Sequence, residues 1–530
     1  MKLTGFLFAA ALLGACTQPA AEENYTRHVD PKIGTGGHGH VFVGANVPFG
    51  LVQVGPTSIP QTWDWCSGYH ASDSTVIGFS HTHLSGTGIG DLFDVTVMPV
   101  MGDVTYARGE EADPASGLWS YADRTQEIAR PGYYSVPLTR YGIRAELTAT
   151  ARVGLHRYTF PASEKAAVVF DLENGGCWDK ATETHLAKEG DRTVTGWRHS
   201  TGWAKDQRVY FAAEFSKPFE KFETIGDNYA RASFRTTDGE QVSLKVALSP
   251  VSIEGAKANL AAELPGWDFD ATAAAADKAW NDELSKVKIE TEDETSKRIF
   301  YTALYHTMVA PSLFCDVNGD YRGADGKVHE NPGRDTYTTF SLWDTYRAAM
   351  PLMTVLHPER MPDIIQTMLH ISDEQGRLPV WHLWGNETDC MVGNPGIVAV
   401  ADAIVKGIGG FDREKAFEAI RKTAMNPDRG NGLRMEYGYI PCEMFNEAVA
   451  YDMDYALADG AAARAAEALG KAEDAKYFEE RSHSYRNYFD PQTGFMRGRD
   501  LKKGWRTPFN AFASTHRADD YCEGNAWQYT

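Results

Sequence analysis

The period of the apolar residues changes near Pro265, and this change constrains the fold more than any other feature of the sequence. Before it, apolar and polar side chains alternate, as in residues 242–248, which is the period of a half-buried strand. After it, Trp280 and Leu284 share one face of a predicted helix, and alanine- and leucine-rich helical segments follow. The sequence therefore predicts an all-β domain, a large sandwich, followed by an all-α domain.

The length and the composition of the chain both indicate more than one hydrophobic core. A chain of 530 residues exceeds a single compact domain, and 43% hydrophobic residues are enough for large cores. The net charge is −20 and no cluster of Lys and Arg stands out, which argues against nucleic acid as a partner. The 13 tryptophans can stack on sugars, but tryptophan fills cores more often.

The N-terminus predicts export. Its apolar run, residues 6–13, is too short to span a bilayer, so residues 1–16 are interpreted as a signal peptide. The four residues ending at Cys16 resemble a bacterial lipobox, which would make Cys16 the acylated first residue of the mature protein. The alternative is an ordinary secretion signal with an incidental cysteine. We expect a periplasmic or cell-surface protein that touches the membrane only through this lipid anchor, with 17–24 as a tether.

Six further cysteines leave the thiol chemistry open. An exported protein can oxidise them, but six cysteines permit 15 sets of pairs and the sequence does not select one. The absence of a CxxC pair argues against a thiolate zinc site. These residues are Cys66, Cys177, Cys315, Cys390, Cys442 and Cys522.

Four segments combine tryptophan, carboxylates and amides in the way a sugar site requires. Carboxylates serve acid and base catalysis, amides bind hydroxyl groups, and indoles stack on sugar rings. The segments are residues 63–70, 340–347, 381–389 and 523–525. By contrast, His81 and His83 lie two apart on a predicted strand without an evident third ligand, so structural hydrogen bonding is favoured over a metal site.

Several segments, in order, resemble those of the calcium-dependent α-mannosidases of glycoside hydrolase family 92. They are residues 44–50, 63–70, 78–88, 341–347, 385–393, 441–455 and 523–529. The resemblance covers nearly all of the mature chain. It implies a multidomain β + α protein with a β-sandwich over 25–262, a short helical linker over 263–290 and a partial (α/α)6 barrel over 291–530.

The family's chemistry implies an exo-acting α-mannosidase that hydrolyses terminal α-mannosides with inversion. Its substrate would be a mannose-containing glycan, either an N-glycan or a mannan. Two carboxyl groups roughly 6.5–9.5 Å apart carry such a reaction. By its motif the general acid is Glu523, and Ca2+ would bind O2 and O3 of the mannose. The sequence does not identify the calcium ligands, the linkage cleaved or the natural glycan.

The resemblance also suggests residues that contact the sugar, and each has a structural alternative. The candidates are Trp63, Asp344, Trp384, Asn386 and Glu387. Asp344 could instead pair with Arg347, Trp63 could be a core residue, and Asn386 and Glu387 could support neighbouring groups. Glu523 itself could cap a helix or bind a backbone amide.

One motif of the family has no match. The general base lies in an Asn-Asp-Asp type segment, and the similar residues 281–283 fall on the predicted linker helix instead. About 240 residues follow Asp293, whereas six helical hairpins need roughly 300 or more. The aromatic end, residues 522–530, also lacks a polar tail. We therefore expect that a C-terminal part with the base is missing and that these 530 residues alone are inactive.

Two other functions remain open at this point. One is another (α/α)6-barrel glycoside hydrolase, trehalase-like or glucoamylase-like, which would not need calcium at the sugar. The other is a non-catalytic glycan-binding surface lipoprotein, which needs aromatic platforms but no positioned acid and base.

Overall fold

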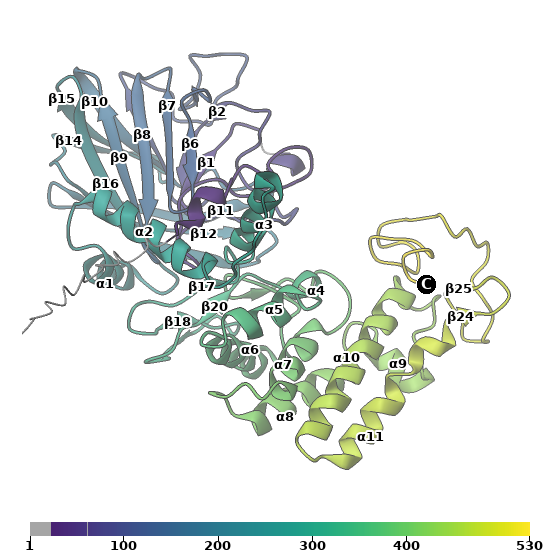
Figure 1. Cartoon of the computed structure of the whole chain (residues 1–530). Helices are drawn as coiled ribbons and strands as arrows, with labels where there is room; N and C mark the ends of the chain where they lie inside the picture. Colours follow the sequence, from purple (N-terminus) through teal and green to yellow (C-terminus); the bar gives the residue numbers. More distant parts are fainter. Residues whose placement is uncertain (1–22, 61) are drawn as a thin grey trace, which may run out of the picture.

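The computed structural model describes residues 23–60 and 62–530, and these form a β-sandwich followed by a helical domain (Figure 1). The predicted order of an all-β and an all-α domain is therefore confirmed. The signal peptide and Cys16 lie outside the described residues. Within the described ranges, no helix has the length and apolar character that a membrane span requires.

The sandwich consists of two antiparallel sheets. One has the strand order β1 (Gly55–Thr57), β3 (Gly78–Ser80), β4 (Thr96–Met101), β10 (Ser163–Asp171), β15 (Tyr229–Thr236) and β14 (Lys221–Ile225). The other has the order β11 (Lys180–Glu189), β12 (Thr193–Thr201), β13 (Gln207–Phe215), β16 (Glu240–Ser249), β9 (Val153–Phe160), β8 (Ile143–Ala149), β7 (Tyr133–Leu138) and β6 (Ile128–Arg130). Their inner faces form one continuous core.

Strand β16 is more buried than its alternating pattern predicts. Val242 and Leu244 point into the sandwich core, as expected. The opposite face is covered as well, because α1 (Ile253–Glu263) packs on β16 and β13. Lys245 on that face is almost fully buried, and its ammonium lies 3.9 Å from the centre of the Trp267 ring.

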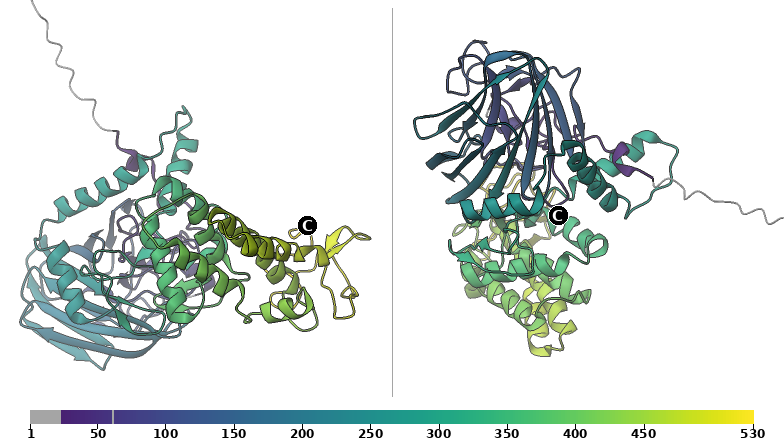
Figure 2. Two further views of the ribbon diagram at one scale, coloured as in Figure 1. Left: turned by 90° about the horizontal axis from the view of Figure 1, so that it is seen from below. Right: turned by 90° about the vertical axis from the view of Figure 1, so that its left-hand side faces the viewer.

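Two helices connect the domains, and an aspartate caps the N-terminus of each. The carboxylate of Asp268 accepts a hydrogen bond from an N–H of the first turn of α2 (Phe269–Leu284), and Asp293 does the same for α3 (Glu294–His306). Trp280 of α2 is buried, and its indole N–H donates to the carbonyl of Asn46 at 2.7 Å. Helix α2 therefore packs against the sandwich, along which it runs in Figure 2.

The helical domain contains α4 (Leu342–Thr345), α5 (Ala349–Leu356), α6 (Met361–Gln375), α7 (Pro395–Val405), α8 (Arg413–Ala424), α9 (Asn431–Tyr437), α10 (Ala448–Ala468) and α11 (Ala472–Arg481). Between them the chain forms short strands that the helical periodicity did not predict. One example is the three-stranded sheet of β21 (Phe340–Ser341), β22 (Trp381–Leu383) and β23 (Asn386–Glu387).

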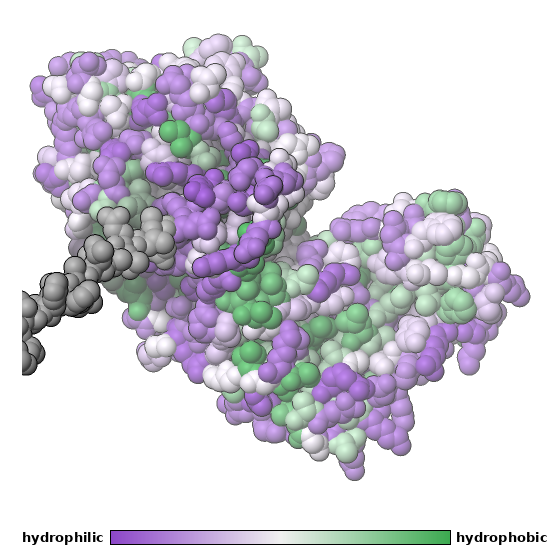
Figure 3. All heavy atoms as spheres, viewed as in Figure 1, coloured by the Kyte–Doolittle hydropathy of each residue, from purple (hydrophilic) through white to green (hydrophobic). Residues whose placement is uncertain are grey.

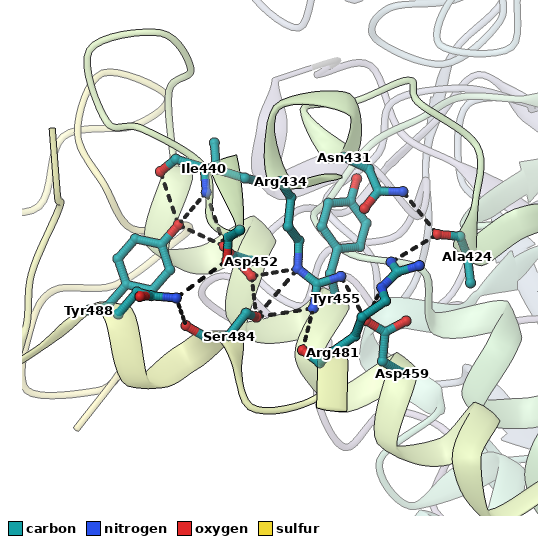
Figure 4. A network of polar contacts seen from close by, with 12 residues as sticks. Ala424, Asn431, Arg434, Ile440, Asp452, Tyr455, Asp459, Arg481, Ser484 and Tyr488 are labelled. Atoms are coloured by element: carbon teal, nitrogen blue, oxygen red, sulfur yellow. Dashed lines mark hydrogen bonds and ion pairs between the residues drawn. The ribbon is translucent and has the colours of Figure 1, made fainter. Parts of the chain in front are cut away.

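A buried ion network fixes α10 against its neighbours (Figure 4). Arg434 of α9 donates to Asp452 at 2.7 Å and to Asp459 at 2.6 Å, both on α10. Tyr488 donates its hydroxyl to the same Asp452 at 2.8 Å. Because buried charges are costly unless they are paired, these contacts permit few other positions of the helix. The first turn of α10 is thereby held in place, and it begins beside the cavity described next.

Candidate active site

A cavity of about 1090 Å3 lies between the sandwich and the helical domain. Loops of the sandwich line one side of it, and loops around α4, α10 and the C-terminal residues line the other. The space-filling view shows the surface hollowed between the two domains (Figure 3). A cavity of this size at a domain interface is typical of a small-molecule or glycan site.

Four tryptophans line this cavity: Trp63, Trp178, Trp203 and Trp381. The first two have 48% and 45% of their surface exposed, which leaves their ring faces available for stacking. Trp203 of the sandwich meets Trp381 of the helical domain edge-on, with ring centres 4.7 Å apart. Both domains therefore contribute aromatic surface to one site. Of the four, only Trp63 was singled out from the sequence as a sugar contact.

Trp63 is held by its own loop and by a glycine-rich segment. It begins the 3-10 helix η2 (Trp63–Trp65), and its indole N–H donates to the carbonyl of Gly88 at 3.1 Å. A Cβ on Gly88 would lie 2.6 Å from that indole nitrogen, so only glycine fits there. His40 packs edge-on against the same indole, with ring centres 4.3 Å apart.

Trp203 is positioned through its backbone. The carboxylate of Asp91 accepts hydrogen bonds from the N–H groups of Trp203 and Ala204 at 2.9 and 2.8 Å. Burial raises the pKa of Asp91 to about 6. The adjacent loop is anchored by Arg198, which is fully buried and paired with Asp94 and Asp179.

Five carboxylates line the cavity: Asp344, Asp389, Glu443, Glu447 and Glu523. Glu523 is exposed and has a left-handed backbone, with a φ of 46°. Its neighbour Cys522 is held from both sides by Tyr529, whose hydroxyl accepts from the Cys522 N–H and donates to the Cys522 carbonyl. Residues 526–529 form a turn, and within the described residues Glu523 caps no helix.

Glu447 is a carboxylate that the sequence reasoning did not single out. It immediately precedes α10, has a φ of 55°, and is 8% exposed. Its Oε1 is buried and has no hydrogen-bond partner among the described residues. Burial raises the pKa of this carboxyl group. Ser, Thr, Asp or Asn is usual at the N-cap of a helix, so a Glu at the N-cap of α10 is the sequence signal that could have identified this residue.

Asp344 lies in the short helix α4 and lines the cavity, as predicted. It accepts a hydrogen bond from Ser341 in its own segment. The alternative salt bridge to Arg347 is not formed. Instead, Arg347 donates to the carbonyl of Trp343 at 3.0 Å and packs over the Trp343 and Tyr346 rings.

The structure places the other three predicted sugar contacts outside this cavity. Trp384 is 2% exposed and packs against Phe314. Asn386 exchanges hydrogen bonds with the backbone of Asp206 at 3.1 Å, which joins the two domains. Glu387 accepts from three backbone N–H groups, including that of Trp381 at 2.9 Å. These residues hold the cavity-lining segment rather than face the cavity.

Calcium requires converging oxygen ligands, and among the described residues no group of three carboxylate or imidazole side chains converges at the cavity. In these residues, the one group of three His, Cys, Asp or Glu side chains with ligand atoms within 4.8 Å is Glu283, His357 and Glu359, away from the cavity. The ammonium of Lys286 lies 2.7 and 2.9 Å from the two carboxylates. An imidazole and a paired ammonium do not suit calcium, so this cluster is an ion-pair network.

Comparison with known proteins identifies the family. The model of the glycosyl hydrolase family 92 N-terminal domain matches residues 28–249, and that of the family 92 catalytic domain matches residues 255–530. A solved family 92 α-mannosidase from Bacteroides thetaiotaomicron, in complex with mannoimidazole, is 37% identical with a TM-score of 0.92, over 96% of this chain and 70% of that one. An inverting family 92 mannosidase from the same organism is 29% identical with a TM-score of 0.86, over 95% and 70%.

A curated relative, an uncharacterized secreted glycosidase of Arthroderma benhamiae, is 27% identical over 90% of this chain, which spans 64% of that protein's length. The chain therefore belongs to glycosyl hydrolase family 92, a glycosidase family, and not to a trehalase-like or glucoamylase-like family.

Proposed function

We propose that the whole protein is an exo-acting α-mannosidase that releases mannose from mannose-containing glycans. The observation that carries the proposal is the position of Glu523, an exposed carboxyl group in a tryptophan-lined cavity between the two domains. The likeness to family 92 α-mannosidases over nearly the whole chain supports the choice of sugar.

In this proposal Glu523 is the general acid. Its carboxyl group would donate a proton to the glycosidic oxygen as the bond to the anomeric carbon breaks. A carboxylate on the opposite side of the sugar would activate the attacking water and invert the configuration. We place this base outside the 530 residues, because no segment of the chain matches the one that carries it in the family.

Asp344 and Glu447 would bind hydroxyl groups of the terminal mannose. Both line the cavity. Asp344 lies on α4, whereas Glu447 directly precedes α10 and its backbone N–H donates to the carbonyl of Asp519, in the segment that carries Glu523. The unpaired Oε1 of Glu447 requires a donor that a sugar hydroxyl would supply. The tryptophans would stack on the apolar faces of the sugar.

Calcium dependence is proposed from family membership alone. When bound, calcium would supply positive charge beside the sugar hydroxyls. No step is assigned to it, because within the described ranges no three carboxylate or imidazole side chains converge at the cavity. Loss of activity in a chelator, and recovery when calcium but not magnesium is restored, would support this part of the proposal.

We also propose that the protein is exported and anchored by lipid at Cys16. The composition of residues 1–16 supports the signal peptide, and the secreted relative supports export.

The test of the function is hydrolysis of a panel of α-linked mannosides by the full-length protein, followed by proton NMR of the released sugar. We expect β-mannose as the first anomer. Release of α-mannose first would refute inversion, and cleavage of α-glucosides in preference to α-mannosides would refute the substrate.

A further inference from the structure

The sulfur atoms of Cys66 and Cys177 lie 3.9 Å apart, although the two residues are 111 positions apart in the sequence. Cys66 is buried and Cys177 is partly exposed. In the described ranges, which contain all six cysteines that follow Cys16, this is the one pair of sulfurs within hydrogen-bonding distance. The fold thus brings together two thiols whose pairing could not be predicted from the sequence.

Both cysteines adjoin tryptophans of the cavity. Cys66 directly follows the 3-10 helix η2, which begins with Trp63, and Cys177 directly precedes Trp178. Trp63 and Trp178 are the two exposed tryptophans that line the cavity from the sandwich side. A bond between the sulfurs would therefore join the two loops that present these rings.

The surrounding backbone holds the two sulfurs in position. Gly90 lies against Cys177, and a Cβ on this glycine would come within 2.2 Å of the sulfur. The Gly90 carbonyl accepts a hydrogen bond from the Trp178 N–H at 2.8 Å. On the other side, the Cys66 N–H donates to the carbonyl of Trp63 at 3.2 Å. Neither thiol sits on a freely moving loop end.

We propose that Cys66 and Cys177 form a disulfide in the exported protein and that this bond fixes the spacing of Trp63 and Trp178. The inference rests on the proposed export, because structural disulfides persist in oxidising compartments. A disulfide has an S–S distance of about 2.05 Å, so each sulfur would move by about 1 Å from its present position. The loop that the bond closes would contain half of the strands of the two sheets, from β3 to β10.

The chemistry has a defined order. Either thiol can donate the hydrogen bond between the two sulfurs, and the partly exposed Cys177 is more accessible to an oxidant than the buried Cys66. Cys177 would therefore attack first, as a thiolate, on a disulfide oxidant such as oxidised glutathione and release one glutathione thiol. Cys66 then loses its proton and displaces the second glutathione. The two thiols give up two electrons and two protons, and the oxidant becomes two thiols.

The experiment exposes the folded protein to oxidised glutathione, alkylates the remaining thiols in denaturant, and maps the peptides by mass spectrometry. We expect loss of two of the six thiols and one cross-linked pair of peptides, containing Cys66 and Cys177. Cys66→Ser should give no cross-linked pair, and its Cys177 should carry glutathione as a mixed disulfide or be alkylated. The other four cysteines serve as internal controls and should be alkylated throughout. Alkylation of both Cys66 and Cys177 in the oxidised wild type, or pairing of either with another cysteine, would overturn the proposal.

A second measurement covers the case in which a single substitution disturbs folding. Reductant should lower the melting temperature of the oxidised wild type and leave that of the Cys66→Ser, Cys177→Ser double variant unchanged. An equal effect of reductant on both proteins contradicts a structural disulfide. If the pair forms with glutathione but is reduced in protein taken from its native host, export is refuted while the pairing geometry stands.

Discussion

Glu447 and Glu523 line the same cavity, and both have a left-handed backbone, with φ values of 55° and 46°. Such values cost energy for residues other than glycine and persist where the surrounding structure imposes them. Glu447 is fixed by the start of α10, and the Glu523 segment is fixed by Tyr529. Two glutamates with a strained backbone at one cavity indicate a functional site. They differ in burial, because Glu447 is buried and Glu523 is exposed.

We expect Glu447→Gln to lower kcat/KM by about 10- to 150-fold in the full-length enzyme. Hydrogen bonds to charged groups contribute about 1.5–3 kcal/mol, and glutamine keeps the shape without the charge. The melting temperature should not fall, because a buried carboxyl with an unpaired oxygen is removed. Glu436→Gln, at an exposed position on α9, is the matched control. A lower melting temperature with unchanged kcat/KM would show that Glu447 is only structural.

Trp203→Ala should raise KM for α-mannosides about fivefold. The substitution removes the edge-to-face contact with Trp381 and one side of the cavity, and aromatic pairs of this kind contribute about 0.5–1.5 kcal/mol. Trp197→Ala is the control, because Trp197 lies on β12, packs against His185 and does not line the cavity. Equal KM values for the two variants would remove Trp203 from the binding site.

Acid should destabilise the sandwich through its buried histidines. The ring of His81 donates from Nδ1 to the Val95 carbonyl and accepts at Nε2 from His156, whose Nδ1 accepts from the Tyr158 hydroxyl. Structural hydrogen bonding is thus confirmed for His81. Burial lowers the pKa of His81 to about 3 and that of His83 to about 4.

The direction of the change in stability with pH follows from proton uptake by the unfolded chain. The unfolded chain protonates its histidines near pH 6.5, while the buried rings stay neutral, so the free energy of unfolding falls as the pH drops from about 6.5 towards 4. Each buried histidine contributes a slope of about 1.4 kcal/mol per pH unit. Buried Asp91, whose pKa is raised to about 6, opposes this slope.

The measurement compares two proteins that both contain Asp91, so the contribution of Asp91 to the pH dependence cancels in the difference. Denaturant unfolding of wild type and His83→Gln is followed between pH 7 and 5. The free energy of unfolding should change with pH less steeply in the variant, by the contribution of one buried histidine, about 1.4 kcal/mol per pH unit. Identical slopes in wild type and His83→Gln would contradict the assignment of a neutral buried ring.

The sequence predicted the order of the domains and the helix that contains Trp280 and Leu284, because both depend on the local period of the apolar residues. It could not predict which side of a short hairpin faces the cavity. In the segment 381–389, Trp381 and Asp389 line the cavity whereas Trp384 does not, since the chain reverses at Trp384 and Gly385. Trp178 and Trp203 lie in loops whose position depends on buried ion pairs between distant strands.

Cys16→Ser should release the protein from membranes. Two or more acyl signals are needed for stable anchoring, and no helix in the described ranges could replace them as a membrane span. The measurement is the distribution of the protein between pellet and supernatant after ultracentrifugation of cells that express the wild type and the variant. Continued sedimentation of the Ser variant with membranes would show that the lipobox interpretation is wrong.

Glu523→Gln in the full-length enzyme tests the general acid. Glutamine preserves the shape of the side chain but cannot deliver a proton to the departing oxygen. General acid catalysis typically contributes 10²–10⁴-fold, so we expect about that loss in kcat for a natural α-linked mannobiose. An aryl α-mannoside with an activated phenolate leaving group needs little protonation and should lose far less.

The ratio of the two losses separates an acid from a residue that only binds or positions the sugar. Glu443→Gln, at a second exposed carboxylate of the cavity, is the matched control and should affect both substrates alike. The 530 residues alone should be inactive on both, because we place the base outside them. Equal losses for Glu523→Gln on both substrates would exclude Glu523 as the acid, and turnover by the 530 residues would locate the base among the cavity carboxylates instead.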